Sequence, residues 1–177
     1  MARTTQTPKN DAPDAIALLK ADHRAVEELF EKFETARGDG AKQRIAEKIC
    51  LELKIHAQIE EEIFYPACRG AIEDDLVDEA IVEHDGAKVL INEIEAGGPD
   101  DAFYEAKVKV LQEQIEHHVE EEEKRVEGMF SQARKAGLDM DELGRRMFER
   151  KEELMDQAER SGLPPAEPTS LGAQPGA

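Results

Sequence analysis

Histidine and glutamate are spaced in this chain as metal ligands would be. Five of the 177 residues are histidines, and four of these fall in four different amphipathic segments. His56 and His118 are each followed four residues later by a glutamate that is also in phase with the apolar residues, so an imidazole and a carboxylate share one helix face. Such nitrogen and oxygen donors suit iron or manganese and would also accept zinc. The candidate metal ligands are His23, His56, Glu60, His84, His118 and Glu122.

The candidate ligands are in phase with the apolar residues around them. His23 continues an apolar row that runs through Leu19 and Val26 in steps of three and four, which is the period of one helix face. His56 and Glu60 occupy such positions in the second segment. Burying imidazoles and carboxylates unpaired would cost several kcal/mol each. A pair of metal ions would offset this cost, because cations accept imidazole nitrogens and neutralise carboxylates that bridge them.

Other polar residues near these positions have more ordinary interpretations. A lone core histidine is more often held by a carbonyl or a carboxylate than by a metal, but four in phase on four segments favour a shared site. His117 and Glu121 repeat the spacing beside the apolar row, so we expect His117 at the surface or hydrogen-bonded behind a ligand. We expect Tyr65 to fill the core, although it could line the site. The flanking glutamates are expected in solvent, although any could hydrogen-bond a ligand histidine; they are Glu61, Glu62, Glu120, Glu121 and Glu123.

Periodic apolar residues and the breaks between them predict five helices. Four long helices are expected at about residues 13–37, 41–67, 74–96 and 100–136. A fifth, amphipathic helix is expected at about residues 140–160, with Asp139 as its N-cap. Short connections between the four long helices favour antiparallel neighbours. The predicted fold is therefore all-α, an up-down-up-down four-helix bundle with an additional C-terminal helix.

The predicted organisation has four parts. A flexible N-terminal tail covers residues 1–11, the bundle 12–137, the C-terminal amphipathic helix 138–160 and a disordered tail 161–177. The last part is rich in proline and glycine and has too few apolar residues to order itself. The fifth helix is expected to pack on the bundle or to mediate self-association.

Charge and composition narrow the expected partners and location. The 41 acidic and 23 basic residues give a net charge of -18, which repels a nucleic-acid backbone and an anionic membrane surface. We therefore expect neither nucleic acid nor a membrane as a partner. No apolar run is long enough to span a membrane, and the first residues lack the apolar core of a secretory signal. Cys50 and Cys68 form no disulfide framework, so we expect a cytoplasmic protein with free thiols.

The order of the motifs resembles that of hemerythrin-like proteins with the HHE cation-binding domain. The matching stretches are Asp22-His23-Arg24, residues 56–66, Glu83-His84-Asp85 and residues 117–123. They fall within about residues 13–136, and the ordered set is specific, whereas a single His-x-x-x-Glu is not. The resemblance implies a non-haem di-iron centre with an oxo or hydroxo bridge. It also implies that each of the four histidines His23, His56, His84 and His118 binds one iron and that Glu60 and Glu122 bridge the two.

Two departures from the oxygen carriers of that family bear on function. Their third helix has a second histidine one turn after the first, and here that position is Lys88. Their last-helix carboxylate lies five residues after its histidine, which His117/Glu122 or His118/Glu123 would satisfy, whereas the apolar row favours His118 with Glu122. A missing ligand leaves metal positions open. The resemblance therefore favours binding of, or reaction with, dioxygen, hydrogen peroxide or nitric oxide, with catalase-like or peroxidase-like turnover, over stable oxygen carriage.

Other functions stay open from the sequence. A redox-sensing module would pass a change at the metal to a partner through the fifth helix. Iron storage or a ferroxidase centre would use the same ligands. A ferritin-like site would show Glu-x-x-His, whereas this chain has His-x-x-x-Glu in phase with its apolar rows at His56/Glu60 and His118/Glu122. An acidic interaction protein without metal would keep its stability when chelators are added.

Overall fold

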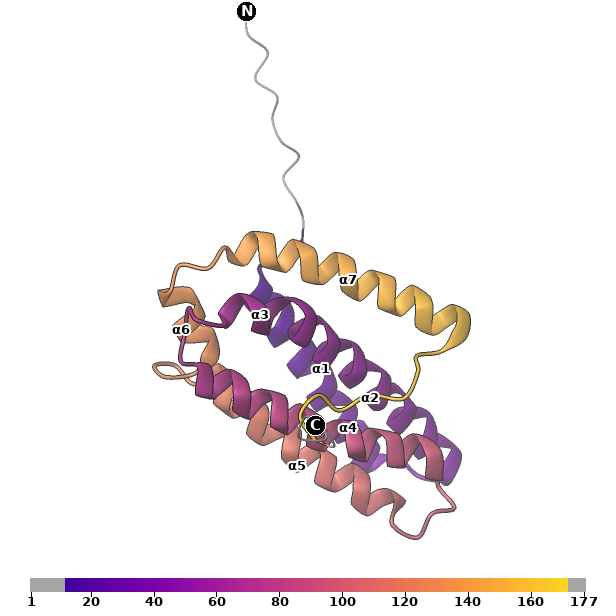
Figure 1. The fold of residues 1–177 in the computed structure, drawn as a ribbon. Helices are drawn as coiled ribbons and strands as arrows, with labels where there is room; N and C mark the ends of the chain where they lie inside the picture. The colour runs from indigo at the N-terminus through magenta and orange to yellow at the C-terminus, as the bar shows by residue number, and fades with distance from the viewer. Residues whose placement is uncertain (1–11, 172–177) are drawn as a thin grey trace, which may run out of the picture.

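The computed structural model describes residues 12–171 and has helices but no β-strand within that range. In chain order (Figure 1) the elements are α1 (Ala15–Thr35), α2 (Asp39–Ile59), the π-helix η1 (Glu60–Phe64), α3 (Tyr65–Cys68), α4 (Asp74–Gly97), α5 (Tyr104–Glu123), α6 (Met129–Lys135) and α7 (Met140–Ser161). The flexible tail predicted for residues 1–11 lies outside the described residues, as do residues 172–177. None of the described helices is both long and apolar enough to cross a membrane.

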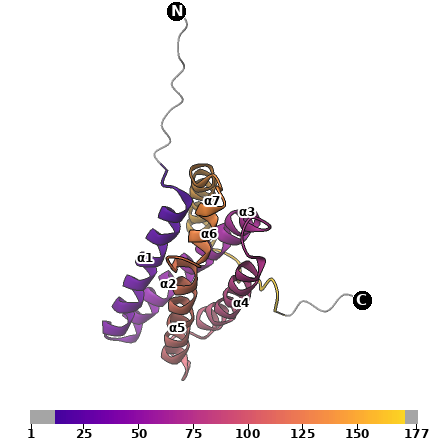
Figure 2. The same ribbon diagram turned by 90° about the vertical axis from the view of Figure 1, so that its left-hand side faces the viewer.

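The long helices α1, α2, α4 and α5 pack side by side as a bundle (Figure 2). α2, η1 and α3 continue one another as a single rod, which packs against α1 and α4, and α5 packs on α4. The predicted all-α four-helix bundle with an additional C-terminal helix is confirmed. Two apolar clusters fill it, one around Leu19 and Phe64 and the other around Val26 and Leu111. His23 lies on α1 between Leu19 and Val26, at the level where one cluster gives way to the other.

The fourth rod is shorter than the sequence pattern predicts. We expected one helix over residues 100–136, but α5 ends at Glu123 and a turn separates it from α6. Lys124 leaves the helical region with a φ of -47° and a ψ of 130°. The chain then returns so tightly that a Cβ on Gly128 would lie 2.6 Å from the Lys124 carbonyl oxygen. Val126, which would continue the apolar row of a longer helix, is 68% exposed, and the single-helix prediction is wrong.

α7 forms where the fifth helix was expected and lies along α1, α2 and η1 (Figure 1). Asp139 caps its first turn by accepting a hydrogen bond from the Glu142 N–H at 3.0 Å. The helix packs so closely on the start of α1 that a Cβ on Gly144 would clash with the Pro13 carbonyl oxygen. Its apolar face is therefore buried against its own chain, and self-association stays a prediction.

The expected C-terminal disorder does not hold for residues 162–171, which return from the end of α7 to α4 (Figure 1). The Asn92 side chain donates to the Ala166 carbonyl at 2.8 Å and accepts from the Ala166 N–H at 2.9 Å. The buried Asp85 carboxylate accepts hydrogen bonds from three successive backbone N–H groups, those of residues 169–171. These polar contacts order a segment whose composition alone predicts disorder.

Candidate metal centre

All six predicted ligands meet in the middle of the bundle, and none is more than 6% exposed. They are His23 on α1, His56 near the end of α2, Glu60 at the start of η1, His84 on α4, and His118 and Glu122 on α5. Each falls on the inward face of its helix because it is in phase with apolar residues that the bundle buries. The structure thus brings together every residue singled out as a ligand, and their binding of metal stays a prediction.

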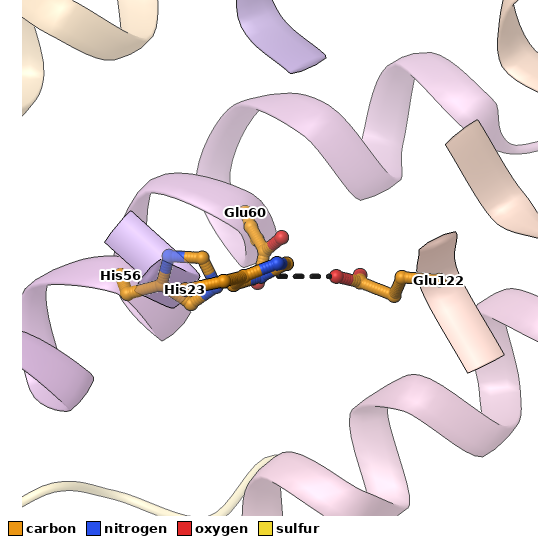
Figure 3. Close-up of side chains that lie close together, drawn as sticks. All are labelled: His23, His56, Glu60 and Glu122. Carbon is orange, nitrogen blue, oxygen red and sulfur yellow. Dashed lines mark hydrogen bonds and ion pairs between the residues drawn. The ribbon is translucent and has the colours of Figure 1, made fainter. Parts of the chain in front are cut away.

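Four of these side chains form a first group (Figure 3). The Nε2 atoms of His23 and His56 are 3.2 Å apart. The Nε2 atom of His56 is 3.2 Å from Oε2 of Glu60, and Glu122 reaches toward His23 from another helix, with 3.5 Å between its Oε2 and the His23 Nε2. The ligand atoms of the group all lie within 4.8 Å of one another, which is close enough for one cation to contact them together.

A second group lies beside the first and shares Glu60 with it. The Nε2 atoms of His84 and His118 are 3.2 Å apart, and Oε2 of Glu60 is 3.3 Å from the Nε2 of His84. Oε2 of Glu122 is 3.6 Å from the Nε2 of His118. Both glutamates therefore stand between the two histidine pairs, as carboxylates that bridge two ions would.

A carboxylate lies next to the outer nitrogen, Nδ1, of each ligand histidine. The N···O distances are 2.8 Å for His23 with Glu123, 2.9 Å for His84 with Glu61, 2.7 Å for His118 with Glu83 and 3.6 Å for His56 with Asp22. An ionised carboxylate only accepts hydrogen bonds, so in the three short pairs Nδ1 carries the proton and the Nε2 lone pair faces the centre. This is the tautomer that binds a metal.

Each of these carboxylates lies directly beside a ligand in the sequence, a relation that the period of a helix face does not reveal. Asp22 and Glu83 each precede a ligand histidine, and Glu61 and Glu123 each follow a ligand glutamate. Glu61 and Glu123 were expected in solvent, with a hydrogen bond to a ligand histidine as the alternative, and the structure shows that alternative. No such role was expected for Asp22 or Glu83. The sequence feature that could have predicted them is an acidic residue next to a ligand in each of the four motifs.

Tyr65 also reaches the site because of the π-helix η1. The wide turn, in which the Tyr65 N–H bonds to the Glu60 carbonyl, places residues five apart on one face. The Tyr65 hydroxyl donates to Glu122 at 3.1 Å and lies 3.2 Å from the Nε2 of His84. Tyr65 therefore fills the core, as expected, and its hydroxyl also lines the site. A uniform α-helix would have turned it away from Glu60.

His117 and Lys88 have other surroundings. The His117 side chain is 62% exposed and its Nε2 lies 3.4 Å from Glu83, so it stands at the rim of the site. The ammonium of Lys88, at the position where oxygen carriers have a histidine, is buried and lies 2.8 Å from Glu61 and 3.3 Å from Asp85. A protonated lysine engaged in this way has no lone pair to offer a metal.

Close packing of these groups shifts their pKa values. Burial, with the neighbouring His56, lowers the pKa of His23 to about 4. Burial opposes charge on His56 too, but Glu60 and Asp22 outweigh it and raise its pKa to about 10. Burial and the adjacent Glu60 raise the pKa of Glu122 to about 8. The cluster thus holds protons that a metal ion would displace.

Two carboxylate oxygens in the centre indicate that a cation fits there. Oε1 of Glu60 and Oε2 of Glu122 are buried and have no hydrogen-bond partner within residues 12–171. Leaving such atoms unpaired costs free energy, and a cation between the histidine pairs would remove that cost. The residues present therefore fit a site for metal ions with mixed nitrogen and oxygen ligands.

The model of the hemerythrin HHE cation binding domain matches residues 14–130, which is more than half of the chain. The chain belongs to this family. The hemerythrin-like domain is accordingly a metal-binding module with a helical bundle. A crystal structure of a hemerythrin HHE cation binding domain-containing protein from Mycobacterium kansasii superimposes with a TM-score of 0.69 and 22% identity, covering 85% of this chain and 95% of that one. At that identity the likeness shows the fold alone.

A curated protein from Nostoc sp. (strain PCC 7120), described as a DNA nickase, is 27% identical over 106 residues. The matched stretch is 60% of this hemerythrin-like chain but 30% of the nickase, so the chain spans less than a third of that protein.

Two segments beyond the family match reach the carboxylates around the site. From α7, the Lys151 ammonium lies 2.5 Å from Asp22, which faces His56. From the C-terminal segment, the Thr169 hydroxyl donates to Glu61 at 3.2 Å. The C-terminal part of this hemerythrin-like protein is thus connected to the surroundings of the ligands.

Proposed function

We propose that this hemerythrin-like protein is a non-haem di-iron protein that binds or reacts with dioxygen, hydrogen peroxide or nitric oxide. The observation that carries the proposal is the pair of histidine groups with two buried carboxylates between them. Mixed imidazole and carboxylate ligands without thiolate suit iron. A catalase-like turnover of peroxide is the enzymatic form of this proposal.

Residues near the ligands are suited to such a reactive centre. A ferrous pair would supply electrons and open coordination positions for the small ligand. Lys88 is engaged with Glu61 and Asp85, which leaves one histidine fewer than in an oxygen carrier. Burial and Glu122 raise the pKa of the Tyr65 hydroxyl well above its usual range, so the phenol keeps its proton beside the two carboxylates.

Metal content and the visible spectrum test this proposal. Protein purified without oxygen should contain about two irons per chain, which is the number that two ligand groups would hold. Charge-transfer bands should appear on exposure to air, and rapid loss of added peroxide would favour an enzyme over a carrier. A chain that takes up no iron, manganese or zinc on reconstitution would contradict the proposal.

Alanine variants test the individual ligands, with His117 as the matched control. His118→Ala and Glu122→Ala should lose most of the metal, as should His56→Ala and Glu60→Ala, because each removes an inward ligand. His117→Ala should retain most of it, because that side chain is mostly exposed. Equal losses in His117→Ala and His118→Ala would refute the assignment of helix faces.

We do not extend the nickase activity of the Nostoc relative to this chain. The match covers 30% of that protein, and a net charge of -18 opposes approach to a phosphate backbone.

A further inference from the structure

A cavity of about 320 Å³ borders the ligand histidines. His23, His56, His84 and His118 all contribute to its wall. One water molecule occupies about 30 Å³ in the liquid, and dioxygen, peroxide and nitric oxide are of similar size. The cavity is therefore far larger than the ligand that the proposed function requires, and the remaining space needs another explanation.

Apart from the histidines, much of the cavity wall is apolar. Each rod of the bundle contributes apolar side chains to it. Val26 comes from α1, Leu53 from α2, Ala87 and Ile91 from α4, and Ile115 from α5. Residues 163–167 of the C-terminal segment complete it, with Leu163 and two prolines among them. Wall atoms of an unfilled apolar cavity lose van der Waals contacts, so occupation by an apolar molecule is favourable.

Five of the six charged side chains on the wall are engaged with partners of the opposite charge, and the sixth, Glu167, is exposed on the C-terminal segment. The N···O distances are 3.0 Å for Lys54 with Glu95, 2.8 Å for Lys88 with Glu61, 2.5 Å for Asp22 with Lys151 and 2.7 Å for Glu62 with Arg150. An ion that enters between these pairs would have to break one of them and leave a charge without its partner, which is costly in a partly buried site. The wall therefore favours an uncharged ligand.

We propose that this cavity binds a neutral, mainly apolar organic molecule of one or two rings beside the metal ligands. An engineered apolar cavity of about 150 Å³ holds benzene, and this cavity has about twice that volume. The inference rests on the proposed function in one respect, that the bound molecule lies next to a metal pair. The volume of the cavity, its apolar lining and the ion pairs on its wall do not depend on which metal is bound.

Indole is a suitable probe because it is neutral, has two fused rings and fluoresces. The chain has no tryptophan, so indole emission can be followed with little background. Zinc-loaded protein avoids quenching by iron, and its metal content is measured on the same sample. We expect saturable binding of indole and of benzene, and much weaker binding of pyrene, whose four fused rings would need the whole cavity.

Ala87→Leu fills the cavity and Ala106→Leu is its matched control on an exposed position of α5. The first should weaken indole binding by about tenfold or more, as extra methyl groups in a small pocket do, and the second should leave it unchanged. Circular dichroism verifies folding, and if Ala87→Leu does not fold, the size series on the unmodified protein decides. Indole and pyrene binding equally, or equal affinity in a folded Ala87→Leu variant, would overturn the proposal.

The two proposals fail in different ways. Metal-loaded protein that shows no saturable indole binding overturns the organic-ligand site and leaves the di-iron proposal intact. Protein that binds indole with the expected size limit but no metal overturns the di-iron proposal alone.

Discussion

Protons on His56 and Glu122 compete with a metal ion for the same lone pairs. Neighbouring carboxylates outweigh burial and raise the pKa of His56 to about 10. Burial and the adjacent Glu60 raise the pKa of Glu122 to about 8. Both groups are therefore protonated at pH 7. Metal binding must release these protons, so affinity should rise with pH by about a hundredfold per unit near pH 7. Above pH 8 the rise should become shallower, because Glu122 has then lost its proton.

Calorimetric titration of zinc into metal-free protein, in buffers with different protonation enthalpies, counts the protons released. At least two per chain are expected at pH 7, because the pKa of His84 is raised as well. Binding without proton release would argue against His56 and Glu122 as ligands.

For individual residues, the sequence predicted the ligands that point into the bundle. It did not predict which carboxylates hydrogen-bond the outer nitrogens of the ligand histidines. His23 and Glu60 were found because the period of an α-helix reports which residues share a buried face. Glu61 and Glu83 lie one residue away from that face, and only the position of the neighbouring helix decides that they meet a histidine. Tyr65 was expected in the core, but its contacts with Glu60 and Glu122 depend on η1, whose wider turn a constant period does not include.

Among the helices, α7 depends on the absence of a side chain at Gly144. An added Cβ would meet backbone atoms of residues 13–15, which cannot rotate away. Gly144→Ala should therefore lower the free energy of unfolding by about 1–3 kcal/mol, as overpacking does. Denaturant unfolding followed by circular dichroism measures this change.

Gly86→Ala on α4 is the matched control, because its Cβ would make only ordinary contacts of 3.6 Å or more with Gln114. It should be neutral or raise the free energy of unfolding by up to about 1 kcal/mol, since alanine is the better helix former. Similar losses in both variants would show that α7 does not pack on α1 as described.

Prediction of the elements succeeded where apolar periodicity was strong and failed where tertiary contacts decide. The ends of α4 and α7 were predicted within a residue or two, because glycines and an N-cap mark them. The end of α5 at Glu123 was missed, since the apolar spacing continues through the turn. Residues 162–171 were expected to be disordered, because composition does not reveal that Asp85 and Asn92 bind them.

For the whole molecule, the C-terminal segment should control how fast solvent and chelators reach the centre. A chain that ends at Ser161 lacks the cavity wall formed by residues 163–167 and the contacts to Asp85. Loss of zinc to an excess of chelator should be faster by about tenfold or more, because local opening is no longer needed. The transfer rate is followed with a chromogenic chelator.

A chain that ends at Leu171 keeps every contact described for this segment and is the control. It should release zinc at the rate of the full-length protein. Equal rates in the chains ending at Ser161 and Leu171 would show that the segment does not limit access.

Each half of the chain contributes both histidines of one group: α1 with α2 the first, and α4 with α5 the second. Carboxylates cross between the halves, because Glu61 bonds to His84 and Glu123 bonds to His23. Neither half can therefore prepare its own metal position before the other has docked. Both metal positions should consequently form together when the two halves dock during folding.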